Sequence, residues 1–170
     1  MNSDCCSTTK VQTGLLAAHE PAVCPACGIK GKVVATLTVK NLVRDHARVE
    51  PSAFFSFCRT ADCNVVYFSE HAVFAKPDIK VRVGIKETAD PVLLCYCFGY
   101  DQESLKRDVE AHGISDIARL IKAEVQAGFC ACAVKNPAGT CCLGDVNLAV
   151  KRLEERKSAI TVARQIGNSG

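Results

Sequence analysis

The chain has 170 residues, a formal net charge of +3 and a hydrophobic content of 48%, values that suit one large domain or two small ones in an ordinary soluble protein. No run of about 18 apolar residues occurs, and the amino terminus lacks the basic and apolar regions of a signal peptide, so we expect a cytoplasmic protein without membrane insertion. So small a charge, scattered along the chain, gives no indication of nucleic-acid binding.

Cysteine is the unusual feature of the composition, with 12 in the chain. Cytosolic thiols are kept reduced, so this content favours metal or redox use over a disulfide framework. The cysteines fall into a terminal pair, a first quartet and a second group. These are Cys5 and Cys6; Cys24, Cys27, Cys58 and Cys63; and Cys95, Cys97, Cys130, Cys132, Cys141 and Cys142.

Residues 1–20 are expected to form a flexible tail. After them, β-branched and aromatic residues are enriched and prolines interrupt the pattern, which predicts short strands. The predicted strands are 32–43, 53–58 and 63–69, with two shorter candidates in HAVFAKP (71–77) and DIKVRVGIK (78–86).

Beyond Pro91 the apolar residues change to a helical period. Helices are predicted over 101–113, with Asp101 as the cap, over 115–128, and from about 143 to 156. The first two end at glycine, the usual left-handed stop of a helix.

The change of period divides the chain in two. We therefore expect an α+β protein in which a small β subdomain (21–90) precedes a three-helix subdomain (91–158). Residues 159–170 form a second flexible tail in this interpretation.

The first quartet has the spacing of a zinc ribbon. CPAC carries Cys24 and Cys27, and CRTADC carries Cys58 and Cys63, each pair on a turn between predicted strands. Two such turns can direct four thiolates at one ion, and metal binding would stabilise a β unit too small to be secure alone. Unligated core cysteines, a redox-active CPAC dithiol and a rubredoxin-like iron site are the alternatives.

The second group lies on two loops. CYC (95–97) precedes the first helix, and the other four cysteines lie between Gly128 and the third helix. A helix hairpin can bring both loops to one end, where helix dipoles favour thiolates. Thiolates from two loops are typical of a [2Fe-2S] site. We therefore expect residues 21–90 to form a zinc-ribbon-like β subdomain and residues 91–158 a three-helix [2Fe-2S]-binding subdomain.

These motifs carry a resemblance to known families. VLLCYCFGYDQESL, a helix pair and a cysteine pair that opens a helix are similar to the [2Fe-2S] domain of bacterioferritin-associated ferredoxin. Over residues 22–156, CPAC, FCRTADCNVVYFS, IKVRVGIKE, CYCFGY and NPAGTCCLGDV resemble, in this order, the amino-terminal domain of CopZ-type copper chaperones. The resemblance implies a zinc site beside a [2Fe-2S] cluster, and a role in copper delivery and in copper reduction.

The resemblance implies Cys95 and Cys97 as ligands of one iron. For the other iron we favour Cys130 and Cys142, with Cys132 and Cys141 as alternates. CopZ chaperones of this kind usually continue into a heavy-metal domain with an M-x-C-x-x-C loop, and this motif does not occur in residues 1–170. We therefore expect copper to be handled by Cys5 and Cys6, by the second group's spare cysteines or by a separate protein.

The predicted function is metal handling with one-electron chemistry, in which zinc, a [2Fe-2S] cluster and Cu⁺ are the metals. The resemblance implies a copper-transporting ATPase, a separate heavy-metal-binding domain or a reductase as partners. One alternative is a ferredoxin-like electron carrier that docks on a reductase or storage protein without binding copper. Another is a zinc-stabilised interaction module without a cluster. No hydrolase or nucleotide-binding signature occurs, so an enzyme is not expected.

Overall fold

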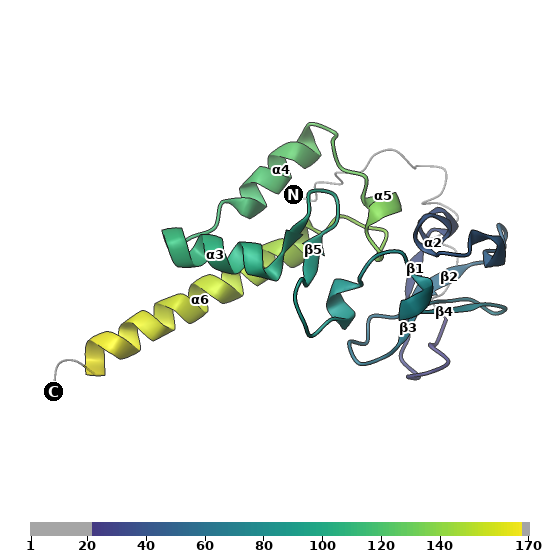
Figure 1. Cartoon of the computed structure of the whole chain (residues 1–170), viewed down its shortest axis with the longest axis horizontal. Helices are drawn as coiled ribbons and strands as arrows, with labels where there is room; N and C mark the ends of the chain where they lie inside the picture. The colour runs from purple at the N-terminus through teal and green to yellow at the C-terminus, as the bar shows by residue number, and fades with distance from the viewer. Residues whose placement is uncertain (1–21, 168–170) are drawn as a thin grey trace.

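The computed structural model describes residues 22–167 of the chain and shows a mixed α+β fold. Figure 1 shows a β-rich part at one end and helices α3, α4 and α6 at the other. The terminal pair Cys5 and Cys6 and the predicted tail 1–20 lie outside the described residues.

The β-rich part is built on a four-stranded antiparallel sheet in the order β1-β2-β3-β4. Its strands are β1 (Lys32–Val34), β2 (Phe55–Phe57), β3 (Val65–Phe68) and β4 (Val73–Ala75). The last three confirm the predicted strands at 53–58, 63–69 and 71–77. Each strand pairs with its neighbour in sequence. The β1–β2 connection contains a helix, whereas β2 and β3 are joined by the loop 58–64, which carries Cys58 and Cys63.

Two predicted strands are wrong. The run 32–43 forms only the short β1 before it becomes a helix, α2 (Thr36–Leu42). Its Thr38, Val39 and Leu42 are buried at helical spacing, and this burial overrides the strand preference of β-branched residues. The run 78–86 contributes only an isolated bridge from Ile79; it begins at the end of one short 3₁₀ turn, η2 (Lys76–Asp78), and finishes in another, η3 (Gly84–Lys86).

The helical part begins with a two-stranded hairpin, β5 (Leu93–Cys95) and β6 (Tyr100–Asp101). Helices α3 (Gln102–His112) and α4 (Ile117–Gln126) confirm the predicted pair, and the Asp101 side chain caps α3 by accepting from the Ser104 backbone N–H. The short helix α5 (Cys132–Lys135) was not predicted. Helix α6 (Leu143–Gly167) is longer than predicted, since no Gly or Pro interrupts it between Gly144 and its last residue.

Separate apolar cores support the two parts. Aromatic and aliphatic side chains fill the first core between the sheet and α2, including Phe55, Phe74 and Val39. The second core lies between α3, α4 and α6, and its fully buried members include Leu105, Ile121 and Val146. Cys95 and Cys142 belong to this second core, so the two loops of the second cysteine group meet inside it.

Polar contacts join the loop 130–142 to the β-rich part. The Thr38 hydroxyl donates to the Ala133 carbonyl at 2.6 Å, and the buried Tyr67 hydroxyl donates to the Pro137 carbonyl at 2.8 Å. The Lys32 ammonium donates to the Thr140 hydroxyl at 2.7 Å. These contacts place α5 against α2, so the β-rich part holds the last cysteine loop in position.

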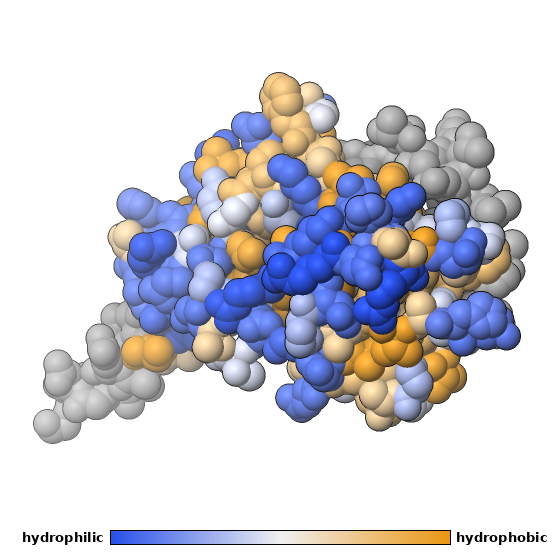
Figure 2. Space-filling model, turned by 45° about the vertical axis from the view of Figure 1, so that its right-hand side comes forward, coloured by the Kyte–Doolittle hydropathy of each residue, from blue (hydrophilic) through white to orange (hydrophobic). Residues whose placement is uncertain are grey.

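The face drawn in Figure 2 carries a broad hydrophilic band across its middle, and apolar residues gather at its lower right. Among the described residues with large exposed apolar side chains, Phe129 is the most exposed, at 70%. It directly precedes Cys130, so one large aromatic ring lies at the rim of the second cysteine group. None of the helices within residues 22–167 has the length and apolar character needed to cross a bilayer.

Candidate metal centres

The first quartet lies on two turns, one before β1 and one between β2 and β3. The Gly28 N–H donates to the Cys24 carbonyl at 2.9 Å, which closes a tight turn that holds Cys24 and Cys27. Cys58 follows β2, and Cys63 precedes β3 after a turn closed by its own N–H to the Thr60 carbonyl at 3.2 Å. The two cysteine pairs therefore face each other at one place, although up to 39 residues separate them along the chain.

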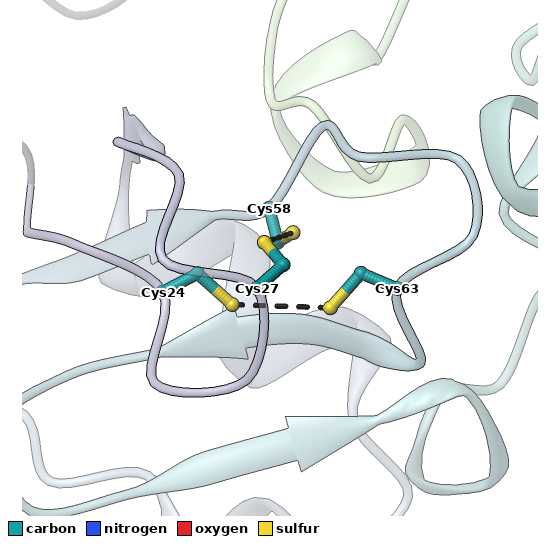
Figure 3. Close-up of side chains that lie close together, drawn as sticks. All are labelled: Cys24, Cys27, Cys58 and Cys63. Carbon is teal, nitrogen blue, oxygen red and sulfur yellow. Dashed lines mark hydrogen bonds between the residues drawn. The ribbon is translucent and has the colours of Figure 1, made fainter.

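The four sulfur atoms have nearly the arrangement of a tetrahedral thiolate site (Figure 3). The Sγ atoms of Cys24 and Cys63 are 3.9 Å apart, those of Cys27 and Cys58 are 3.7 Å apart, and all four lie within 4.8 Å of one another. Thiolates about 2.3 Å from a zinc ion stand about 3.8 Å apart in a regular tetrahedron. The geometry and chemistry of these donors thus fit one zinc ion.

The surroundings of this quartet act differently on its thiols. A hydrogen bond with the Thr60 hydroxyl, 3.3 Å from the sulfur, lowers the pKa of Cys27 to about 6. Burial raises the pKa of Cys63 to about 12 and also raises that of Cys24. One thiol is therefore ionised readily near neutral pH, whereas the buried ones need a cation to become thiolates.

The second group forms a chain of sulfur contacts across two loops. Cys97, in the hairpin between β5 and β6, has its sulfur 3.5 Å from that of Cys132, the first residue of α5. Cys142, just before α6, hydrogen-bonds through its side chain to both Cys132 and Cys95. The Ala131 N–H donates to the Cys97 sulfur at 3.2 Å. The contacts therefore join Cys97, Cys132, Cys142 and Cys95 in that order.

These sulfur contacts set the proton affinities of the second group. The contact with Cys142 lowers the pKa of Cys132 to about 5 and that of Cys95 to about 7. Burial raises the pKa of Cys97 to about 12, and the contact with Cys132 raises that of Cys142. Cys132 and Cys95 are thus the thiols of this group that ionise more readily.

The structure brings together Cys95, Cys97 and Cys142, which the sequence favoured, with Cys132, one of the two alternates, while the favoured Cys130 packs beside the same cluster. Cys132 is buried, whereas Cys130 and Cys141 are half-buried. The reason is the short helix α5, whose docking on α2 turns Cys132 inward. Nothing in FCAC distinguishes Cys130 from Cys132 locally, so the sequence left both as candidates.

Comparisons with known proteins agree with this architecture. A family model described as the zinc binding domain of CopZ matches residues 21–80. The copper chaperone CopZ of Archaeoglobus fulgidus is 32% identical over 148 residues, which cover 81% of this chain and 71% of that protein. The X-ray structure of the A. fulgidus CopZ N-terminal domain superposes with a TM-score of 0.61 and 35% identity, over 71% of this chain and 92% of that one. The chain therefore belongs to the CopZ family.

Proposed function

We propose that this protein handles soft metal ions, with one zinc ion at the first cysteine quartet and a [2Fe-2S] cluster at the second group, and supports the delivery of copper. The observation that carries the proposal is a quartet of cysteine sulfurs that all lie within 4.8 Å of one another, with a second group of contacting cysteine sulfurs apart from it, in a chain of the CopZ family. A ferredoxin-like carrier that never binds copper is the alternative.

The zinc site is structural in this proposal. Cys24, Cys27, Cys58 and Cys63 supply a complete set of four thiolates, so no coordination position is left for a substrate. The small sheet has a limited apolar core, and metal binding contributes to its folding. Zinc therefore holds the turns in the geometry that the rest of the β-rich part requires.

For the cluster we propose Cys95, Cys97, Cys132 and Cys142 as ligands. Their sulfurs touch in the pairs Cys97–Cys132 and Cys95–Cys142, which links each cysteine of the hairpin to the other loop. This differs from the sequence interpretation, in which Cys95 and Cys97 served one iron. When bound, such a cluster supplies one-electron chemistry suited to converting Cu²⁺ into Cu⁺, the form that thiolates hold.

The protein residues around these ligands bury them and donate to them. Cys95, Cys132 and Cys142 are buried, which keeps water from their sulfurs. The Ala131 N–H stabilises negative charge on the Cys97 sulfur, and hydrogen bonds of this kind tune the reduction potential of thiolate-bound iron.

Copper is a substrate in this proposal, and the half-buried Cys130 and Cys141 are the candidates to bind it. Both border the second group, and the Cys141 side chain also hydrogen-bonds to Cys132. Cu⁺ prefers soft thiolate ligands, so a pair of accessible cysteines suits it. Cys5 and Cys6 are further candidates outside the described residues. A copper-transporting ATPase or a separate heavy-metal-binding domain would receive the ion.

Metal analysis of the protein purified without oxygen tests the two resident sites. We expect about two irons, two sulfides and one zinc per chain, with a red-brown visible absorption. Cys132→Ala should abolish the absorption, whereas its matched control Cys130→Ala should keep it. A colourless protein that contains only zinc would refute the cluster, and bleaching by Cys130→Ala alone would refute the ligand assignment.

Copper titration separates delivery from simple electron transfer. The parent protein should bind Cu⁺ against a chelator without losing iron, and the double variant Cys130→Ser/Cys141→Ser should bind less while it keeps the cluster absorption. Identical Cu⁺ binding by both proteins would exclude this cysteine pair. Failure of the parent to bind Cu⁺ would favour the ferredoxin-like alternative.

A further inference from the structure

Lys86 is a buried cation beside the first cysteine quartet. Its side chain belongs to a residue only 4% exposed, and no other Lys, Arg, Asp or Glu within residues 22–160 is as deeply buried. The ammonium donates to the Thr60 carbonyl at 2.7 Å and to the Cys63 carbonyl at 3.0 Å. Both carbonyls belong to the loop that carries Cys58 and Cys63, so Lys86 holds this loop through two hydrogen bonds to its backbone.

Among the residues that the structure describes, no carboxylate forms an ion pair with the Lys86 ammonium within 4.0 Å. The neighbouring Glu87 pairs instead with Lys76 at 3.1 Å and with Arg82 at 2.9 Å. A buried cation that binds only neutral carbonyls pays a desolvation cost that a nearby anion would offset. The cysteine quartet is adjacent, because the Thr60 hydroxyl contacts the Cys27 sulfur at 3.3 Å. Four thiolates around one divalent ion carry an excess of negative charge that suits this position.

The same segment also contacts the second cysteine group. The Tyr96 hydroxyl, between Cys95 and Cys97 in the chain, donates to the Arg82 carbonyl at 3.0 Å and accepts from the Gly84 N–H at 2.7 Å. Gly84 lies so close to β5 that a β-carbon there would overlap the Leu93 carbonyl. Residues 82–87 are therefore held by the CYC hairpin at one end and by the quartet loop at the other.

We propose that residues 82–87 couple the two cysteine sites. In this arrangement Lys86 is a positioning residue whose charge stabilises the metal-bound quartet, and the Tyr96 hydroxyl transmits the position of the CYC hairpin to Lys86. Metal binding at the quartet then orders the hairpin, and the reverse holds because coupling between two binding sites is reciprocal. The inference rests on zinc binding at the quartet, as proposed above.

Zinc affinity, measured on the full chain by competition with a chromogenic chelator, tests the role of Lys86. Lys86→Met removes the charge and keeps most of the apolar stem, and it should weaken zinc binding by about fivefold or more. Lys86→Arg, which keeps the charge, should recover part of the loss. Lys80→Met is the matched control, since the Lys80 ammonium also donates to a backbone carbonyl but is exposed and binds Asn41.

Tyr96→Phe tests the coupling itself, because it removes a hydroxyl from the other cysteine site. We expect zinc affinity to fall by about fivefold, because only part of the effect of losing two hydrogen bonds is coupled to zinc binding. Tyr100→Phe, in the same hairpin, is the control. In the parent, zinc loading should also slow alkylation of Cys95 and Cys97 in iron-free protein, and Tyr96→Phe should reduce this protection.

The possible results separate the inference from the function on which it rests. A parent protein that binds no zinc would refute both. Stoichiometric zinc binding with equal affinities in the parent, Lys86→Met and Tyr96→Phe would overturn the coupling and leave the zinc site intact. A loss in Lys86→Met that Lys86→Arg does not recover would exclude the charge as its cause. Equal alkylation rates with and without zinc would exclude ordering of the hairpin.

Discussion

The hydrogen bond from Tyr67 to Pro137 offers a sharp test of how the β-rich part supports the second cysteine loop. Tyr67 is fully buried, and its hydroxyl donates to the Pro137 carbonyl at 2.8 Å. Burial raises the pKa of Tyr67, so the hydroxyl keeps its proton and remains a donor. Pro137 is itself buried, and Tyr67→Phe would leave its carbonyl without this donor.

The expected cost follows from this burial. A buried carbonyl that loses its hydrogen-bond partner costs about 1 to 3 kcal/mol, more than the net strength of an average hydrogen bond. The ring itself stays, so its packing on Phe57, at 5.8 Å between centroids, is unchanged. We therefore expect Tyr67→Phe to lower the free energy of unfolding by about 1 to 3 kcal/mol.

Guanidinium denaturation followed by circular dichroism measures this difference, with parent and variant at equal metal content. The midpoint should fall while the slope stays constant, because the surface exposed on unfolding does not change. Tyr100→Phe is the control for loss of a tyrosine hydroxyl, since Tyr100 is only half-buried. A stability of Tyr67→Phe within about 0.5 kcal/mol of that control would refute the reasoning.

Three further predictions concern stability in each part of the molecule. Leu105 is fully buried in the helical core, so Leu105→Ala should lower the free energy of unfolding by about 2 to 5 kcal/mol in the same denaturation assay, and a smaller loss would mean that the core collapses into the space. The Arg82 guanidinium, assisted by Lys76, lowers the pKa of Glu87 below its usual 4.5. Because the folded pKa is the lower one, the pairing stabilises the protein fully above the unfolded pKa of the carboxyl, and this stabilisation is lost as the pH falls through the folded pKa. Glu87→Gln should therefore cost about 1 kcal/mol at neutral pH, and this cost should disappear as the pH falls through the folded pKa of Glu87. A pH-independent difference in the unfolding midpoint would contradict this. Gly139 has φ +66°, and an added β-carbon would lie 3.0 Å from Val34 and 3.1 Å from the Thr38 hydroxyl. Gly139→Ala should therefore destabilise the protein by about 1 kcal/mol more than Gly128→Ala, because Gly128 has φ +83° but open space around it. Equal melting temperatures of the two variants would show that Val34 and Thr38 move to make room for the added methyl group.

Local sequence signals were sufficient where local physics decides the structure. Asp101 and Gly113 mark the ends of α3 because capping and a left-handed residue act within one turn. The paired cysteines CPAC and CRTADC converge because each pair lies on its own tight turn beside adjacent strands. The helix ends and the position of each cysteine pair on its own turn required no knowledge of the distant chain.

Distant contacts decided the features that sequence patterns missed. Thr38 and Val39 favour a strand by their intrinsic preference, but both are fully buried in α2, where Thr38 reaches Ala133. The same contact fixes α5, and with it the inward position of Cys132. Because a partner 95 residues away makes this selection, no local pattern could have distinguished Cys132 from Cys130.

The separation of the two cysteine sites along the chain has a consequence for synthesis. The first quartet is complete once Cys63 has been made, whereas the second group awaits Cys142. At about 5 to 20 residues per second, a ribosome needs roughly 4 to 16 seconds for the interval. The surfaces around Thr38 and Tyr67 that receive the last loop already belong to the β-rich part. The order of translation thus makes all four cysteines of the first quartet available for metal binding several seconds before the last cysteine of the second group is synthesised.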